Sequence, residues 1–255
     1  LSPATIAIMI EGIQGEGGLT MASPEFLLGL RKLCDEKRML LFMDGVQDGY
    51  FRTGRFQSFQ RILEQRAVGI LPTETNQPCQ QDAGITFLPD GISIAKSLGG
   101  GSPFGALWAR APYGDVLGPG THASTFGGTP LGCAVALKIL EVVREEKLAD
   151  NARTVGEFLK ASLQALAKKY PQVIHETRGV GLMIGIELAA NIPKLPGDTT
   201  KTQAVRFVNL LHAAGLLTIP AGANVIRLLP ALNLRQGEAE EGLKIIEAVA
   251  AKLAG

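Results

Sequence analysis

The stretch Gly91-Ile92-Ser93-Ile94-Ala95-Lys96-Ser97-Leu98-Gly99-Gly100-Gly101 decides the fold that we predict for this chain. Its first residues are apolar and β-favouring, so they predict a short buried strand. Lys96 follows that strand, where burial would cost free energy for a cation and favour a neutral, nucleophilic amine. The glycines allow a sharp turn and a close approach to a bound group. The same pattern also fits a lysine whose ammonium reaches water, so the stretch alone leaves both interpretations open.

The composition is typical of an α/β enzyme with many tight turns. The chain has 255 residues, 46% of them hydrophobic and only 5% aromatic, with 31 glycines. This length suits one large domain or two smaller ones. The net charge of +1 gives no reason to expect nucleic acid or an anionic membrane as a partner. No apolar run reaches the roughly 20 residues that cross a bilayer.

The cysteines and the beginning of the chain indicate where the protein resides and how much of it is present. Cys34, Cys79 and Cys133 are odd in number and lack metal-ligand spacing, so we expect no metal site and a reduced, cytoplasmic setting. No basic segment of a signal peptide precedes the first strand. The chain opens with Leu1 and runs almost at once into a strand, so we expect the carboxyl-terminal part of a longer protein.

Two apolar runs lead to polar residues at positions where open α/β sheets bind ligands. The run at residues 5–10 suits a central parallel strand and ends in the glycine-rich loop 11–18. The run at residues 39–43 leads to Asp44. An acid there is a catalytic group, the partner of a cation, or a helix cap, and the pattern does not choose between them. Between these runs, Ser23-Pro24 predicts a helix start, with Phe26, Leu27, Leu30 and Leu33 as its buried stripe.

A third polar loop precedes a predicted helix. Residues 118–128 are rich in glycine and hydroxyl groups, and a long helix is expected from about Pro130. Hydroxyls and free backbone N–H groups before a helix N-terminus favour an anion. Residues 58–89 interrupt the alternation of strands and helices, so we interpret them as an inserted surface excursion.

The second part of the chain has a different pattern, and we place a domain boundary at about residue 150. Residues 1–150 then form part of a large α/β domain with a mostly parallel sheet. Residues 151–255 read as helix–strand–strand–helix–strand–helix, a small α+β domain. Arg227 stands in the middle of its last strand, which is an unusual place for a charge.

A lysine, an acid, a hydroxyl-rich anion loop and a strand arginine are the groups that pyridoxal phosphate chemistry uses. Ordered motifs make the chain resemble class III pyridoxal-phosphate aminotransferases, among them the acetylornithine and ornithine aminotransferases. The matching runs are Glu11…Gln14-Gly15-Glu16-Gly17-Gly18, Asp44-Gly45-Val46-Gln47, Arg52-Thr53-Gly54, Ala95-Lys96-Ser97-Leu98-Gly99-Gly100-Gly101, Ser124-Thr125-Phe126-Gly127-Gly128, Arg178-Gly179-Val180-Gly181-Leu182-Met183 and Ile226-Arg227. The resemblance implies the carboxyl-terminal part of the large domain of a fold-type I transferase, followed by its small domain.

The resemblance also implies residues that hold the cofactor, pyridoxal 5'-phosphate. Lys96 is similar to the lysine that forms the Schiff base and shuttles the proton, and Asp44 to the acid beside the pyridine nitrogen. Gln47 resembles the glutamine that contacts the ring hydroxyl. Thr125, with Ser124 beside it, resembles the phosphate-binding residue that reaches into the neighbouring subunit's site, which implies a homodimer with shared active sites.

For the substrate, the resemblance implies that Arg227 clamps the α-carboxylate. Glu16 is similar to the acid that screens an active-site arginine in one half-reaction and releases it in the other. Arg178 is expected to organise a strand turn. The implied reaction moves an amino group from an ω-amine donor, N-acetylornithine first of all, to 2-oxoglutarate. Ornithine, 4-aminobutyrate and other ω-amino acids are alternative donors, and a non-catalytic remnant is the alternative to an enzyme.

The chain departs from the family pattern at several positions. Gly12 stands in place of a proline, Gly45 in place of a glutamate and Asp48 in place of a small hydroxyl residue. Tyr50-Phe51 replaces small residues, and Ala123 replaces a glycine. The family's amino-terminal half, with a second phosphate loop and a residue stacked on the pyridine ring, has no counterpart in this sequence. We therefore expect the 255 residues to be inactive by themselves.

Overall fold

The computed structural model describes residues 2–64, 87–125, 127–192 and 194–255. The chain divides into two compact units, which are described separately. Unit 1 comprises Leu1–Gly12, Ala22–Phe51 and Arg55–Lys147, and unit 2 comprises Ile13–Met21, Arg52–Gly54 and Leu148–Gly255. No helix among the described residues is long and apolar enough to pass through a membrane.

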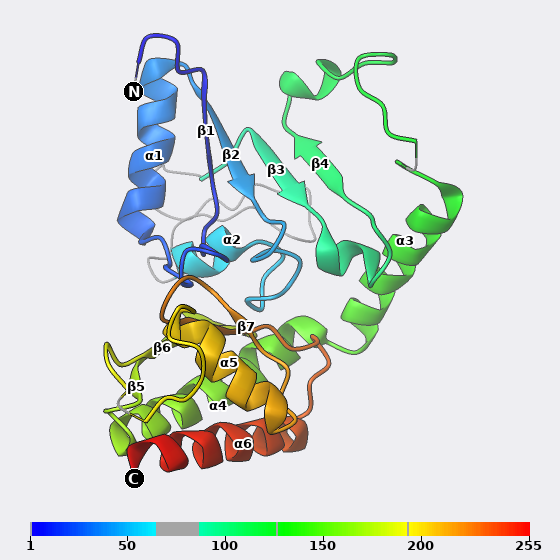
Figure 1. The fold of residues 1–255 in the computed structure, drawn as a ribbon. Helices are drawn as coiled ribbons and strands as arrows, with labels where there is room; N and C mark the ends of the chain where they lie inside the picture. Colours follow the sequence, from blue (N-terminus) through cyan, green and yellow to red (C-terminus); the bar gives the residue numbers. More distant parts are fainter. Residues whose placement is uncertain (1, 65–86, 126, 193) are drawn as a thin grey trace. The chain divides into compact units, whose positions relative to one another are not determined.

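Unit 1 is built on a four-stranded sheet of order β1-β2-β3-β4 (Figure 1). The first three strands run parallel and β4 is antiparallel to β3, which confirms the predicted mostly parallel α/β sheet. Its elements are β1 (Ala7–Ile10), α1 (Pro24–Lys37), β2 (Leu40–Asp44), α2 (Ser58–Leu63), β3 (Gly91–Ile94), the 3-10 helix η2 (Lys96–Gly99), β4 (Ala106–Ala109), the 3-10 helix η3 (Tyr113–Asp115) and α3 (Pro130–Glu145).

Helix α1 begins as the sequence predicts, since Ser23 is its N-cap and accepts a hydrogen bond from the Phe26 N–H at 3.1 Å. The predicted buried stripe is wrong in part. Leu27 is buried, whereas 53% of Phe26 is exposed. The face that packs on the sheet also buries Arg31, a charged residue that the apolar pattern omitted.

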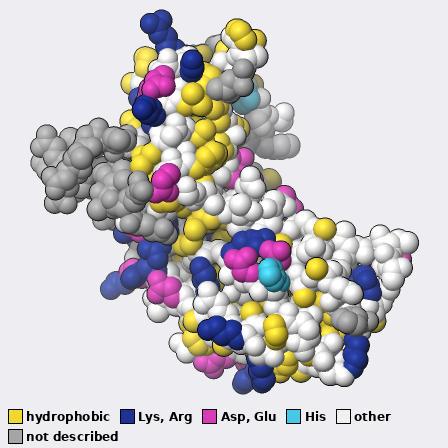
Figure 2. Space-filling view, turned by 90° about the vertical axis from the view of Figure 1, so that its left-hand side faces the viewer, with side chains coloured by type: hydrophobic (Ala, Val, Ile, Leu, Met, Phe, Trp, Pro, Cys, Tyr) yellow, Lys and Arg dark blue, Asp and Glu magenta, His cyan; other side chains and the backbone are white. Residues whose placement is uncertain are grey.

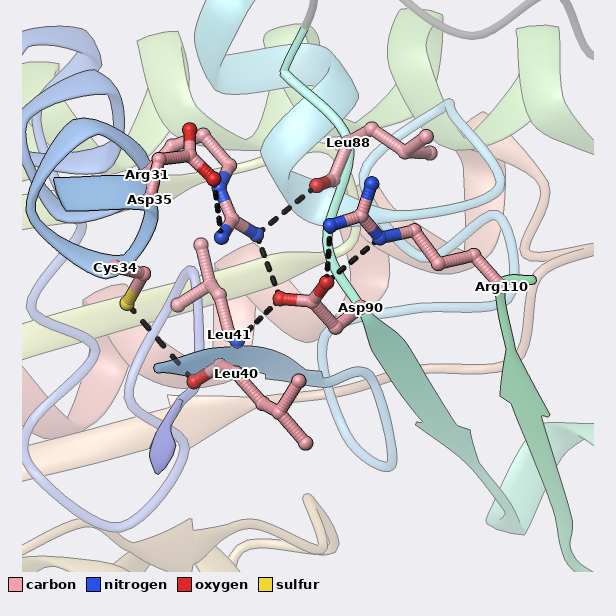
Figure 3. A network of polar contacts seen from close by, with 8 residues as sticks. All are labelled: Arg31, Cys34, Asp35, Leu40, Leu41, Leu88, Asp90 and Arg110. Atoms are coloured by element: carbon pink, nitrogen blue, oxygen red, sulfur yellow. Dashed lines mark hydrogen bonds and ion pairs between the residues drawn. The ribbon is translucent and has the colours of Figure 1, made fainter. Parts of the chain in front are cut away.

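Arg31 is buried because it belongs to a polar network at the amino ends of β2 and β3 (Figure 3). Its Nη1 lies 2.8 Å from Asp90 Oδ2 and donates to the Leu88 carbonyl at 3.2 Å. The same Asp90 oxygen accepts from the Leu41 N–H at 2.7 Å, and Oδ1 accepts from Arg110 Nε at 2.6 Å. One buried carboxylate thus joins α1, β2 and the segments next to β3 and β4, and fixes the strands whose opposite ends carry the candidate site.

Both edges of the described sheet expose apolar side chains. Beside and within β1, Ile6 is 78% and Met9 is 59% exposed, and on β4 Leu107 is 53% and Trp108 is 41% exposed. Figure 2 shows hydrophobic side chains gathered over the part of unit 1 that carries β1 and α1. The run at residues 5–10 was expected to form a central strand. Among the described strands it is instead an edge strand, paired only with β2.

The predicted insertion at residues 58–89 is only partly open to comparison, because residues 65–86 lie outside the described residues. Its two ends are not surface excursions. Helix α2 buries Phe59 and Ile62, and the rings of Phe59 and Phe87 lie 5.2 Å apart. These apolar side chains belong to the interior of unit 1, which explains why that part of the prediction is wrong.

Unit 2 packs helices against an antiparallel sheet of order β5-β6-β8-β7. Its elements are α4 (Leu148–Lys169), β5 (Ile174–Val180), β6 (Met183–Leu188), α5 (Gln203–Ala213), β7 (Ile219–Pro220), β8 (Val225–Leu228) and α6 (Gln236–Ala254). The predicted order of elements is present, and the two-residue strand β7 was missed. Leu163, Ile186, Phe207 and Ile246 are among the buried residues of a core that α4, the sheet, α5 and α6 share.

The turn between β5 and β6 requires glycine. Gly179 has a φ of +115°, and a Cβ there would lie 2.1 Å from the Met183 carbonyl oxygen. At Gly181, with a φ of +59°, a Cβ would lie 2.6 Å from the Arg52 carbonyl oxygen. The Leu182 N–H donates to that carbonyl at 3.0 Å, so the Arg52-Thr53-Gly54 motif packs directly against this turn.

Candidate functional site

In unit 1, Asp44 and Lys96 lie at the carboxyl ends of neighbouring parallel strands. Asp44 is the last residue of β2, and Lys96 follows β3 by two residues. In the register of the two strands, Asp44 pairs with Ser93. The carboxyl edge of a parallel sheet is where α/β proteins bind ligands, so the two side chains stand where the sequence predicted a site.

Of the two interpretations that the sequence left open for Lys96, the structure shows the exposed one. The Lys96 side chain is exposed, because β3 ends at Ile94 and Lys96 begins η2. Its φ of +50° is in the left-handed region, which is uncommon for a residue other than glycine. Gly100 and Gly101, which follow in the same turn, also have positive φ, of +54° and +106°.

The Asp44 carboxylate is held through one oxygen. Oδ1 accepts hydrogen bonds from the Val46 N–H at 3.0 Å and from Ser93 Oγ at 3.1 Å. Oδ2 has no hydrogen-bond partner in the part of the chain that the structure describes. At the edge of the sheet, Asp44 thus presents one acceptor oxygen that no described residue occupies. Gln47 lies half-buried in the loop that follows.

Two departures from the family pattern fit their surroundings in this loop. A Cβ at Gly45 would lie 2.1 Å from Gln57 Oε1 and 3.0 Å from the Ser93 carbonyl oxygen, so a larger residue would have to displace the buried Gln57. Asp48 is buried and accepts a hydrogen bond from Ser58 Oγ. A Cβ at Gly12 would lie 2.3 Å from that same Ser58 oxygen, so glycine at position 12 leaves room for the Asp48–Ser58 pair.

The predicted hydroxyl loop precedes α3, and this helix begins at Pro130 as expected. Ser124 and Thr125 are exposed in the segment before it. Thr129, which was not among the predicted site residues, is the N-cap of α3 and accepts a hydrogen bond from the Gly132 N–H at 3.3 Å. A threonine directly before a proline at the first helical position is the signal that could have identified it.

In unit 2, Arg227 on β8 holds the loop 13–21. The side chain is only 5% exposed, and its Nη1 donates to the Gly15 carbonyl at 2.6 Å. The same nitrogen forms an ion pair with Glu16 Oε1 at 2.8 Å. The two residues that the sequence assigned to the substrate, Arg227 and Glu16, are therefore in direct contact.

Arg178 on β5 holds the other end of the same loop. Its Nε donates to the Gly18 carbonyl at 2.6 Å, and its Nη1 forms ion pairs with Glu187 and, at 3.3 Å, with Glu176. Leu19, fully buried, packs beside Gly185 in the same region, where a Cβ would lie 3.2 Å from Leu19 Cβ. These contacts seat the loop on the sheet of unit 2 and keep Glu16 next to Arg227.

The chain is similar in sequence to known proteins. A family model described as "Aminotransferase class-III" matches residues 1–65 and 79–250. The acetylornithine aminotransferase of Gloeobacter violaceus is 38% identical over 253 residues, which are 99% of this chain and 54% of that protein.

Two solved structures have similar folds. The N-acetylornithine aminotransferase of Stenotrophomonas maltophilia superposes with a TM-score of 0.76 at 30% identity, over 98% of this chain and 57% of that one. The ornithine aminotransferase of Toxoplasma gondii gives a TM-score of 0.78 at 33% identity, over 98% of this chain and 52% of that one. The chain therefore spans about half the length of the relatives it matches.

Proposed function

Since this chain belongs to the class-III aminotransferases, we propose that it takes part in a transamination that carries an amino group from an ω-amine donor to 2-oxoglutarate. The membership confirms the resemblance inferred from the ordered motifs, and the family as a whole depends on pyridoxal phosphate. The relatives that are named for acetylornithine support N-acetylornithine as the donor. We further propose a role in arginine biosynthesis on the same grounds, and a reduced, cytoplasmic setting from the three cysteines without metal-ligand spacing.

The residues of unit 1 fit pyridoxal phosphate. A protonated ring nitrogen needs a negatively charged acceptor, and Asp44 Oδ2 has no partner among the described residues. Lys96 offers a primary amine at the end of the adjacent strand. This pairing of an open carboxylate oxygen with an amine at the carboxyl edge of one sheet is the observation that carries the proposal.

Each candidate site residue of unit 1 then has a proposed role. Lys96 would hold the cofactor covalently, Asp44 would hold the proton on its ring nitrogen and Gln47 would bind its ring hydroxyl. Ser124 and Thr125 would bind the phosphate. When bound, pyridoxal phosphate supplies the electron sink of the reaction. Lys96 Nζ would move the proton at the substrate carbon that bears the amino group.

In unit 2, Arg227 would bind a carboxylate of the substrate through charge-assisted hydrogen bonds. The ion pair with Glu16 supports a second task, in which Glu16 covers Arg227 when the donor has no carboxylate to place there. We further propose a homodimer with shared active sites. The exposure of Thr125 supports this arrangement, because its hydroxyl is accessible to a second copy of the chain.

Ornithine is the alternative donor that a comparison favours, because the Toxoplasma gondii structure is of an ornithine aminotransferase. Measuring glutamate formation from N-acetylornithine, ornithine and 4-aminobutyrate, with 2-oxoglutarate, separates these donors. Absence of turnover with every donor, in protein completed with the remaining length of its relatives, would favour a non-catalytic remnant.

The cofactor assignment is tested by borohydride trapping. Protein incubated with pyridoxal phosphate is reduced, digested and analysed by mass spectrometry for the modified lysine. We expect the adduct on Lys96 and its loss in Lys96→Ala. Lys147 is a matched control, because it is also exposed and has a left-handed φ of +52°. An adduct that persists in Lys96→Ala, or that forms equally on Lys147, contradicts the assignment.

A further inference from the structure

The orientation of the Asp44 carboxylate depends on a neighbouring strand. Of its two hydrogen bonds, the one from the Val46 N–H at 3.0 Å comes from its own loop. The other comes from Ser93 Oγ on β3, at 3.1 Å. Both reach Oδ1, and Oδ2 has no hydrogen-bond partner in the described part of the chain.

The sheet fixes where the Ser93 hydroxyl stands. Ser93 is the register partner of Asp44 in the parallel pair of β2 and β3. Its carbonyl oxygen accepts from the Gly45 N–H at 2.9 Å, which ties the residue after Asp44 to the same position on β3. Ser93 thus contacts the end of β2 at two points, through its backbone and through its hydroxyl. The feature of the sequence that points to this contact is a serine in an otherwise apolar strand.

A second donor matters because the χ2 torsion of aspartate is broad and roughly two-fold. With the Val46 N–H alone, the carboxylate plane could still rotate about χ2 while one oxygen keeps that hydrogen bond. A donor on the adjacent strand, in a second direction, limits this rotation and so fixes the position of the other oxygen, Oδ2.

We infer that Ser93 is a positioning residue, which holds Asp44 Oδ1 so that Oδ2 is free for the ring nitrogen of the cofactor. The inference rests on the proposed function, in which Asp44 is the carboxylate that binds this nitrogen. Ser93 acts through Asp44 and is not assigned any contact with the cofactor or the substrate.

The test is a double-mutant cycle on the affinity for pyridoxal phosphate. Ser93→Ala removes the hydroxyl and keeps the carbonyl that binds Gly45, whereas Ser93→Thr keeps a hydroxyl on a residue that suits a strand. Each change is combined with Asp44→Asn. The dissociation constant is measured on the full 255-residue chain by equilibrium dialysis, with pyridoxal phosphate up to millimolar concentration. Thermal unfolding without cofactor reports whether each variant is folded.

We expect Ser93→Ala to weaken binding by roughly 3- to 10-fold in the parent chain, as for the loss of one hydrogen bond. In the Asp44→Asn background the same change should alter the dissociation constant less than about 2-fold, because the amide at position 44 can still accept from Ser93 but no longer offers a carboxylate oxygen to the ring nitrogen. Ser93→Thr should stay near the parent value. If Ser93 had only a structural role, Ser93→Ala would weaken the binding of pyridoxal phosphate equally in both backgrounds, and that result overturns the inference.

The cycle separates the inference from the function on which it rests. If Asp44→Asn weakens binding and Ser93→Ala does not, Ser93 is not a positioning residue and the proposed function stands. If Asp44→Asn has no effect on the dissociation constant, the assignment of Asp44 fails and the inference fails with it.

Discussion

Glu16 and Arg227 form an ion pair of 2.8 Å in which the acid is 76% exposed and the arginine only 5% exposed. Arg227 keeps a second partner, the Gly15 carbonyl at 2.6 Å. The acid can therefore leave toward water while the arginine stays in place. This asymmetry suits a residue that covers a carboxylate-binding arginine and then exposes it.

We predict that Glu16→Gln strengthens the binding of dicarboxylates such as 2-oxoglutarate, because the competing carboxylate is removed. A partly exposed ion pair contributes up to about 1 kcal/mol, so the dissociation constant should fall by up to roughly 5-fold. Calorimetric titration of the 255-residue chain provides the measurement. Glu238→Gln is the matched control, since Glu238 also pairs with an arginine of unit 2, Arg235, at 2.6 Å on the surface. Equal effects of the two substitutions would contradict a special role for Glu16.

A second prediction concerns the network of Figure 3. Asp90→Asn removes the buried carboxylate that pairs with Arg31 and Arg110, while Asp35, 2.8 Å from Arg31, remains, so we expect unit 1 to lose about 1.5–3 kcal/mol of unfolding free energy. Urea unfolding gives this value. The surface pair Lys138–Glu141 is the control, because Glu141→Gln should cost less than about 1 kcal/mol. A loss from Asp90→Asn no larger than that of the control would show that the network contributes little to stability.

The same network predicts a dependence on pH. Burial by itself disfavours the charged form of Asp90, but hydrogen bonds from Arg31, the Leu41 N–H and Arg110 outweigh it and hold the pKa of Asp90 below its ordinary value of 3.8. Because the folded pKa is depressed, the stabilisation is present above pH 4 and is lost as pH falls through the folded pKa. In Asp90→Asn this acid-dependent loss of stability should be smaller, which urea unfolding at pH 3 and pH 6 would reveal.

The sequence predicted those features that local patterns encode. Ser23-Pro24 marks the start of α1, and the apolar run before Asp44 places that acid at the end of a strand. The order of strands and helices in unit 2 follows from alternation and amphipathic spacing in the same way. The arginine in β8 was recognisable because a charge interrupts an otherwise apolar strand.

The remaining features depend on residues far apart in the chain. Arg31 and Asp90 are 59 positions apart, and neither has a local signal that predicts the other. Lys96, two residues after β3, has a left-handed backbone angle and an exposed side chain, neither of which an apolar pattern encodes. The contact of Glu16 with Arg227 needs the loop 13–21 to fold onto β8, and the bonds that seat it come from residues more than 150 positions away.

A third prediction concerns the turn between β5 and β6. Gly179→Ala forces a side chain onto a φ of +115° and places its Cβ 2.1 Å from the Met183 carbonyl oxygen. We expect a loss of about 3 kcal/mol in the unfolding free energy of unit 2. Gly237→Ala is the control, because that position lies in the first turn of α6 and, apart from its chain neighbours and the adjacent helix backbone, no described atom lies within 4 Å of the new Cβ. There alanine should stabilise the helix by about 0.5–1 kcal/mol, and a similar effect at both positions would contradict the strain argument.

The last prediction is that the 255-residue chain associates in solution and binds pyridoxal phosphate weakly. The described sheet of unit 1 ends in two edge strands that expose apolar residues, Ile6 and Met9 near β1, and Leu107 and Trp108 on β4. Exposed apolar edges pair with other strands, and charges on an edge strand oppose this pairing. Met9→Lys should therefore reduce association measured by light scattering, whereas Thr20→Lys, a change at an exposed position outside the strands, should not.

The activity of a protein completed to the length of its relatives tests whether the 255 residues lack part of the cofactor site. The chain spans about half the length of its relatives, so the remaining length of a homologue, supplied in cis or in trans, can cover these edges and add donors for the phosphate. Each charge-assisted hydrogen bond that is absent costs roughly 1.5–3 kcal/mol of binding free energy, which makes weak retention of the cofactor the expected result for the 255 residues alone. A coupled assay of glutamate formation from N-acetylornithine is then run on monodisperse protein with added cofactor. Turnover should appear only in the completed protein, and rapid turnover by the 255 residues alone would show that this chain builds its phosphate site without further segments.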